Sequence, residues 1–501
     1  MNPIFEQLKQ ELDKVEALQM ALTLFEWDNA TLAPKQAIQN TAKAIGILSK
    51  EYYDALINEK VKGLLIQLER EQDVSDDERA VIKEVKKNYE QLELIPAKEY
   101  QAYSELTSTS QHIWEEAKEN NDFSLFANTL ETIISYQKRF ADYALEKKGE
   151  FATRYDKLLN DYEEGFTTKE LDCFFEELKE TIVPLVKMVV DHKDKIKKEY
   201  ATRFCPVEQQ KEFNLFLAKY IGFDFEKGVI AESVHPFTTN LHNKDVRITT
   251  AYEENLMESA IFSTIHEGGH ALYEMGVDDA YTMSPVGGGT SMGMHESQSR
   301  LFENNIGRSR AFWEPLFPKL KECYKEVLQD VDFDTFLRGI NKAEPSLIRT
   351  ESDELTYCLH IMIRYEIEKC FMNETLSADE IRQLWNEKYE QYLGVRPQTD
   401  AEGVLQDVHW SQGSIGYFPS YAIGNAAAAQ IYAHLNSIMP VEQYLKTGNV
   451  TPIIEYLREH IHRFGKTKNM QQMLKEMTGE PLNPKYYTEY LKEKYTALYQ
   501  G

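Results

Sequence analysis

The sequence predicts a predominantly α-helical protein with one small β element. Near the amino terminus, apolar side chains recur at spacings of three and four residues from Phe5 to Phe25, the apolar stripe of one long helix. Only 24 glycines and 16 prolines interrupt the 501 residues, so we expect few turns and long helices. Three capping boxes mark further helix starts: Ser75 with Glu78, Thr167 with Glu170, and Ser377 with Glu380.

The β element is predicted between Ala231 and Thr250, where the chain reads AESVHPFTTNLHNKDVRITT. Val246 and Ile248 alternate with polar residues, which is the period of a short strand. We expect a lone strand, with an edge that an extended peptide could pair with. A small structural hairpin without a ligand is the alternative.

Composition and organisation narrow the class of protein. The chain has no fixed-period repeat and no linker rich in proline, glycine or serine, so we expect one domain spanning residues 1–501. A formal net charge of -26 argues against nucleic-acid binding, because phosphate backbones are bound by Lys and Arg surfaces. We expect no signal peptide and no membrane span, since no stretch approaches roughly 18 apolar residues.

The cysteines indicate a reducing compartment. The five cysteines are widely scattered and form no CxxC pair. We therefore expect reduced core thiols in a cytoplasmic protein. They are Cys173, Cys205, Cys323, Cys358 and Cys370.

One segment has the pattern of a metal site. Residues 261–272 read IFSTIHEGGHAL, with His266 and His270 four positions apart. On a helix these residues share one face, about 6 Å apart along the axis, and two imidazoles so placed can bind one Zn²⁺. Glu267 then lies near the ion without binding it. We expect Glu267 to accept the proton of the attacking water and to pass it to the leaving amine.

A chance origin of this pattern is disfavoured. With 12 histidines in 501 residues, about 0.03 random matches are expected in such a chain. Gly268 and Gly269 each cost a helix about 1 kcal/mol relative to alanine. Close approach of a substrate or of another backbone would offset that cost. Two structural histidines on a core helix are the alternative.

A third metal ligand is expected at Glu296, in the helical segment MHESQSRLFENNIG. A carboxylate there completes a His, His, Glu set and leaves one position for water. Arg300 follows one helical turn later and can brace Glu296. The third histidine of the short metzincin spacing is absent. From spacing alone, an exposed glutamate at a helix start is the alternative.

With these residues in place, the chain resembles the thermostable carboxypeptidase family, also called carboxypeptidase Taq-like, nearly from end to end. Several motifs in the right order are more specific than the metal motif alone, and nothing departs from the family at the metal positions or at Glu267. The motifs are WDxAT at 27–31, HPF at 235–237, DxRxT at 245–249, HEGGH at 266–270, HES at 295–297, IRTESDELTY at 348–357 and GVLQDVHW at 403–410.

The resemblance implies a zinc-dependent metallocarboxypeptidase that releases single residues from the carboxyl ends of peptides with broad preference. It implies a two-lobed, almost wholly helical fold with a deep groove, similar to thimet oligopeptidase and angiotensin-converting enzyme. It also implies a homodimer with one Zn²⁺ per subunit, for which Co²⁺ or Mn²⁺ could substitute. An oligoendopeptidase or peptidyl-dipeptidase on the same fold is the nearest alternative. A helical scaffold with a vestigial zinc site and an acidic binding module without metal are alternatives from other classes.

An exopeptidase also needs a cation for the terminal carboxylate of its substrate, and Arg supplies a bidentate fork. Arg349 is the first candidate and Arg247 the second, with an ordinary ion pair as the alternative for each. His235, in the HPF motif, is expected to contact substrate. By similarity to related helical peptidases, His409 and Tyr421 are candidates for the donor that stabilises the tetrahedral intermediate, with ordinary packing as the alternative.

Overall fold

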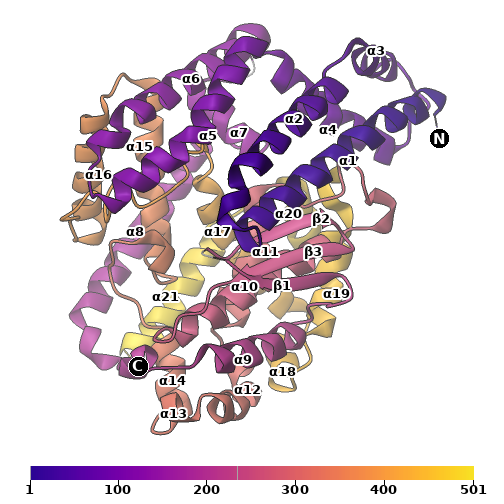
Figure 1. Cartoon of the computed structure of the whole chain (residues 1–501). Coiled ribbons are helices and arrows are strands. Elements are labelled where there is room, and N and C mark those ends of the chain that lie inside the picture. The colour runs from indigo at the N-terminus through magenta and orange to yellow at the C-terminus, as the bar shows by residue number, and fades with distance from the viewer. Residues whose placement is uncertain (1, 150, 234, 501) are drawn as a thin grey trace. The chain divides into compact units, whose positions relative to one another are not determined.

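The computed structural model describes residues 2–149, 151–233 and 235–500, and it confirms a predominantly helical fold with one small sheet (Figure 1). The chain divides into two compact units. Unit 1 comprises residues 1–93, 198–340 and 431–482, and unit 2 comprises residues 94–197, 341–430 and 483–501. Among the described residues, no helix has the length and apolar character needed to span a membrane.

Unit 1 combines an amino-terminal helical region with the sheet and the helices that surround it. Asn2 caps the start of helix α1, and its side chain accepts hydrogen bonds from the first turn. The predicted apolar stripe of α1 is buried at Phe5, Leu8, Leu12, Val15 and Leu22. The elements are α1 (Pro3–Thr31), α2 (Ile38–Leu56), α3 (Glu59–Leu68), α4 (Asp76–Glu93), α9 (Val207–Tyr220), β1 (Gly228–Glu232), β2 (Thr238–His242), β3 (Asp245–Thr250), α10 (Met257–Met275), α11 (Met292–Arg300), α12 (Arg310–Cys323), α13 (Lys325–Leu328), α14 (Phe333–Ile340), α18 (Val441–Lys446), α19 (Thr451–His460) and α20 (Met470–Thr478).

The β element is larger than the sequence indicated. Its three strands are in the order β1-β3-β2, with β1 parallel and β2 antiparallel to β3. Val246 and Ile248 are buried, as the alternation predicted. The expectation of a lone strand with a free edge is wrong, because β3 is the central strand and both of its edges are already paired. The sheet packs on α10, which carries the predicted metal motif (Figure 1).

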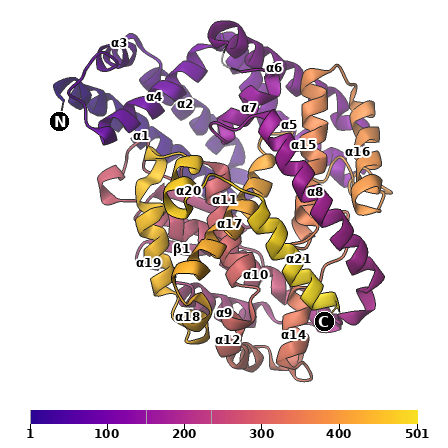
Figure 2. The ribbon, with the colours of Figure 1, turned by 180° about the vertical axis from the view of Figure 1, so that it is seen from behind.

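Unit 2 is built from helices. Although far apart in sequence, α8 and α21 lie side by side (Figure 2). The capping boxes of α8 and α16 form as predicted, and so does the box before α4 in unit 1. The elements of unit 2 are α5 (Ala97–Glu119), α6 (Ser124–Lys148), α7 (Arg154–Tyr162), α8 (Thr168–Asp191), α15 (Tyr357–Asn373), α16 (Ala378–Leu393) and α21 (Lys485–Gln500), and α17 (Pro419–Ile438) runs from unit 2 into unit 1.

No disulfide joins cysteines among the described residues, as expected. Cys205 and Cys358 are buried in the core, as expected. The expectation of a core position is wrong for Cys173, which is exposed on α8. Cys323 and Cys370 are only partly buried.

Candidate active site

The HEGGH segment lies in the middle of α10, where nearly every side chain is buried. The two glycines have a packing role. A Cβ atom at Gly269 would lie 2.7 Å from the carbonyl oxygen of Gln298, so α11 approaches α10 at backbone distance. At Gly268 a Cβ atom would lie 2.3 Å from a methyl group of Ile221. We expected these glycines to allow close approach of either a substrate or another backbone, and at Gly269 the structure shows another backbone.

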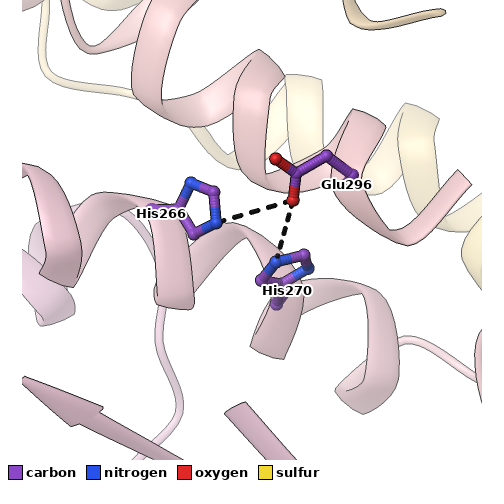
Figure 3. Close-up of side chains that lie close together, drawn as sticks. All are labelled: His266, His270 and Glu296. Carbon is purple, nitrogen blue, oxygen red and sulfur yellow. Dashed lines mark ion pairs between the residues drawn. The ribbon is translucent and has the colours of Figure 1, made fainter. Parts of the chain in front are cut away.

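Three side chains from α10 and α11 converge at this contact (Figure 3). One carboxylate oxygen of Glu296 lies 3.6 Å from Nε2 of His266 and 3.5 Å from Nε2 of His270. The three candidate ligand atoms all lie within 4.8 Å of one another, and no other such group occurs among the described residues. The close packing at Gly269 therefore brings the Glu296 helix within reach of both imidazoles.

This donor set fits a zinc ion. Ligands about 2.0–2.1 Å from a tetrahedral ion are separated from one another by about 3.4 Å. The two nitrogen-to-oxygen separations around Glu296 are close to that edge length. Two imidazole nitrogens and a carboxylate also leave one position of a tetrahedron for water, as catalytic zinc sites do.

Glu296 is held ionised. Burial alone would raise its pKa, but Arg300 and the two histidines outweigh burial and hold the pKa well below the usual value. Arg300 donates from Nε to Glu296 across 2.6 Å, the brace that the spacing predicted. For His270, burial lowers the pKa to about 3. A neutral imidazole and an ionised carboxylate are the protonation states that a metal ion requires.

His266 has an acidic partner that sequence reasoning missed. Its Nδ1 lies 2.8 Å from Oε2 of Glu303, whose carboxylate also accepts from Arg300 and Arg308. Glu303 belongs to a π-helical turn, Leu301–Ile306, that continues α11, and such turns recur at functional sites. The available signal was the separation of seven residues between Glu296 and Glu303, two helical turns on one face.

Glu267 lies beside the three candidate ligands without being one of them. Its Oε2 accepts a hydrogen bond from the hydroxyl of Thr238 on β2 across 2.6 Å. Burial raises the pKa of Glu267, partly opposed by His266 and Thr238. Thr238 was also missed, because nothing in the sequence indicates which strand residue faces the helix.

The two other candidates in unit 1 are placed differently. Arg247 donates from two nitrogens to the carboxylate of Asp245, and its guanidinium lies 4.8 Å from the ring centre of Trp27. The contact between Arg247 and Asp245 is an ordinary ion pair, which was the alternative to a role of Arg247 in binding the substrate carboxylate. His235 is exposed in the loop between β1 and β2.

In unit 2, Arg349 belongs to a buried charged cluster. Its Nε and one terminal nitrogen donate to Oδ1 of Asp407, and the other terminal nitrogen donates to the hydroxyl of Tyr357. Oδ2 of Asp407 accepts from Arg364, which is fully buried. Burial would raise the pKa of Asp407, but the two guanidinium groups hold it well below its ordinary value.

His409 and Tyr421 contact one another in the same unit. Nε2 of His409 lies 3.1 Å from the hydroxyl of Tyr421. Burial, together with Arg349, lowers the pKa of His409 to about 3, so the imidazole is neutral near neutral pH. Its Nδ1 is buried without a hydrogen-bond partner among the described residues.

These features define the class of the protein. A helical HEGGH segment and a carboxylate from a second helix supply the three donor atoms, and a buried glutamate lies next to them, which is the arrangement of a metal-dependent hydrolase. Comparison with known proteins identifies the family.

The model of the carboxypeptidase Taq (M32) metallopeptidases matches residues 7–495. Carboxypeptidase 1 of Bacillus subtilis (strain 168) is 44% identical over 490 residues, which are 97% of each protein. Thermostable carboxypeptidase 1 of Pyrococcus furiosus is 35% identical over 503 residues, 99% of each. The crystal structure of an M32 carboxypeptidase from Deinococcus radiodurans R1 matches with a TM-score of 0.95 at 33% identity, covering 100% of both chains. The chain belongs to the carboxypeptidase Taq (M32) metallopeptidase family, as the motifs predicted.

Proposed function

We propose that this metallocarboxypeptidase releases single amino acids from the carboxyl ends of peptides, with broad preference and with one Zn²⁺ per chain held by His266, His270 and Glu296. The observation that carries the proposal is the convergence of the three donor atoms from two helices at separations that suit a tetrahedral ion. Imidazole and carboxylate ligands suit zinc, and they also accept Co²⁺ or Mn²⁺ as substitutes.

When bound by these residues, the ion would supply Lewis acidity, which would lower the pKa of water to about 7 and polarise the scissile carbonyl. Glu267 accepts the proton of the attacking water and then passes it to the leaving nitrogen. The hydrogen bond from Thr238 to Oε2 fixes the direction of the Glu267 carboxylate. Arg300 keeps Glu296 ionised by donating to its other oxygen.

Arg349 is the proposed group for the terminal carboxylate of the peptide. Within the described part of unit 2, Asp407 and Tyr357 take three of its five N–H groups, and two remain for a substrate oxygen. Arg247 is the second candidate, and it would first have to exchange Asp245 for the substrate. His235 is assigned a substrate contact because it is exposed in its loop.

His409 and Tyr421 are the proposed donors to the oxyanion of the tetrahedral intermediate. Because their polar atoms lie 3.1 Å apart, one hydrogen bond joins them, and only one of the two can donate to that bond. The neutral state of His409 supports a role as a hydrogen-bond donor and not as a charged group. We also propose that the enzyme acts in the cytoplasm, because its cysteines are widely scattered and form no CxxC pair, and that the whole chain is one domain. By its likeness to the family, we propose that it forms a homodimer.

A peptide digestion tests the proposed function. Mass spectrometry of a free-carboxylate peptide should show loss of one residue at a time from the carboxyl end. The same peptide with an amidated end should remain intact, because it lacks the charge that Arg349 would bind. A chelator should stop the reaction and added zinc should restore it. Cleavage of the amidated peptide at an internal bond would instead identify an endopeptidase.

A further inference from the structure

His270 contacts a second histidine on its side away from Glu296. Nε2 of His270 lies 3.5 Å from the Glu296 carboxylate, and its Nδ1 lies 2.6 Å from Nδ1 of His295 on α11. Nε2 of His295 lies 2.6 Å from Oε1 of Glu274, one turn beyond His270 on α10. His270, His295 and Glu274 therefore form a continuous hydrogen-bonded chain.

The order of donors along this chain follows from its two ends. Glu274 accepts from the side-chain amide of Asn240 across 2.6 Å and from the backbone N–H of Gly289 across 3.0 Å, so its carboxylate serves as an acceptor. A neutral His295 then donates to Glu274 from Nε2, which leaves its Nδ1 unprotonated and able to accept. His270 must donate from Nδ1, and its Nε2 is consequently unprotonated.

We propose that His295 is a positioning residue that keeps His270 in the one tautomer able to bind zinc through Nε2, with Glu274 as the terminal acceptor. The inference rests on the proposed zinc site and adds residues that lie outside its ligand set. The two ligand histidines are then supported differently. His266 meets a carboxylate directly at Glu303, whereas His270 reaches its carboxylate through a second imidazole.

The loop before α11, which contains Gly287, Gly288 and Gly289, belongs to the same arrangement. Besides the Gly289 N–H donated to Glu274, a Cβ atom at Gly289 would lie 2.6 Å from the His295 ring. The His295 ring is therefore fixed by hydrogen bonds at both of its nitrogens and by its contact with this loop. The side chain of His295 is 19% exposed and that of Glu274 is 6% exposed, so little water competes for the chain of hydrogen bonds.

Zinc affinity, measured by competition with a chromophoric chelator, tests the proposal without reference to turnover. His295→Phe keeps a ring but removes both nitrogens, and the dissociation constant for zinc should rise about 10- to 100-fold. His295→Asn places an amide oxygen near the position of Nδ1, so it should recover most of the affinity. Glu274→Gln, which keeps an acceptor oxygen and loses the charge, should weaken binding by a smaller factor than His295→Phe.

The matched control is His434→Phe. His434 is also half-buried in unit 1 and lies 2.9 Å from the hydroxyl of Tyr456. Its substitution should leave zinc affinity unchanged. Thermal unfolding of the zinc-free proteins, monitored by circular dichroism, shows whether each variant is folded. If His295→Phe does not fold, the zinc affinities of His295→Asn and Glu274→Gln test the proposal.

Two results would overturn the proposal. One is zinc affinity in His295→Phe equal to that of the wild type. The other is an equal loss in His295→Phe and His295→Asn, which would show that the ring fills space and that its acceptor nitrogen is not needed. Hydrolysis of the free-carboxylate peptide is measured on the same samples. A wild-type protein that binds zinc tightly but hydrolyses nothing would refute the proposed function and leave the affinity comparison interpretable.

Discussion

The hydroxyl of Thr238 donates to Oε2 of Glu267 across 2.6 Å, and this contact joins strand β2 to the residue proposed as the general base. A hydrogen bond to a charged group contributes about 1.5–3 kcal/mol. Thr238→Val keeps the shape of the side chain and removes the donor. We expect kcat to fall about 10-fold or more with unchanged zinc content.

The control for this substitution is Thr239→Val, because successive residues of a strand point to opposite faces. It should leave kcat unchanged. Equal kcat values in Thr238→Val and the wild type would show that Glu267 is oriented by other contacts.

Glu267→Gln tests the proton transfer itself. The amide is nearly the same size as the carboxylate but cannot accept the proton of water, so kcat should fall by about 10²- to 10⁴-fold. Zinc content, measured by elemental analysis, should stay at one ion per chain because Glu267 is not a ligand. Turnover close to that of the wild type would remove Glu267 from the role of base.

Gly269→Ala tests the contact between the two ligand helices. The added methyl group would meet the backbone of Gln298 and Ser299 at 2.7 Å, so α11 must shift and carry Glu296 with it. We expect weaker zinc binding and a lower Tm. Gly63→Ala on α3 is the control, since a Cβ atom there meets nothing within 4 Å. That change should raise stability by about 0.5–1 kcal/mol, and equal behaviour of the two variants would contradict the packing argument.

Asp407→Asn tests the charged cluster of unit 2. The change leaves Arg349 and Arg364 buried without their shared carboxylate, which costs about 3–5 kcal/mol. The exposed Asp379, paired with Arg382, provides the control, because Asp379→Asn should cost less than about 1 kcal/mol. Urea unfolding of the zinc-free proteins near neutral pH measures both.

The same cluster predicts a pH dependence. The pKa of Asp407 in the folded protein lies well below the unfolded value of about 3.9. Its contribution is therefore fully present above that unfolded value and is lost as the pH falls through the folded one. The stability difference between wild type and Asp407→Asn should be constant from about pH 6 to 8 and should narrow below about pH 4. A difference that narrows toward high pH would contradict the assignment.

Helices, capping boxes and the metal motif could be predicted because each depends on residues close together in sequence. His266 and His270 need only one helical turn, and Ser377 needs only Glu380. The place of Glu296 could be inferred from its residue type and from the family motif. Local geometry dictates the first two contacts, whereas the contact of Glu296 with the histidines depends on the packing of α11 on α10.

The supporting contacts could not be predicted in this way. Thr238 and Glu267 are 29 positions apart, and their contact depends on how the sheet packs on α10. The lone-strand expectation failed for a related reason. The parallel partner of β3 begins at Gly228, and pairing across that distance is a tertiary property that alternation in β3 does not reveal.

The ionisable side chains around the three donor atoms have a consequence for the protein without its ion. Among the described contacts, Glu296 and Glu303 are paired with the guanidinium groups of Arg300 and Arg308, whereas Glu267 and Glu274 accept hydrogen bonds from Thr238, Asn240 and the backbone of Gly289. Counted as ionised, the four carboxylates exceed the two guanidinium groups by two charges, the charge of one divalent cation. Without the ion, these carboxylates repel one another in a poorly hydrated interior, and protonation relieves part of the repulsion because the pKa values of Glu267 and His266 are raised. Loading with a divalent cation should therefore make this part of unit 1 harder to unfold, whether or not a peptide is present.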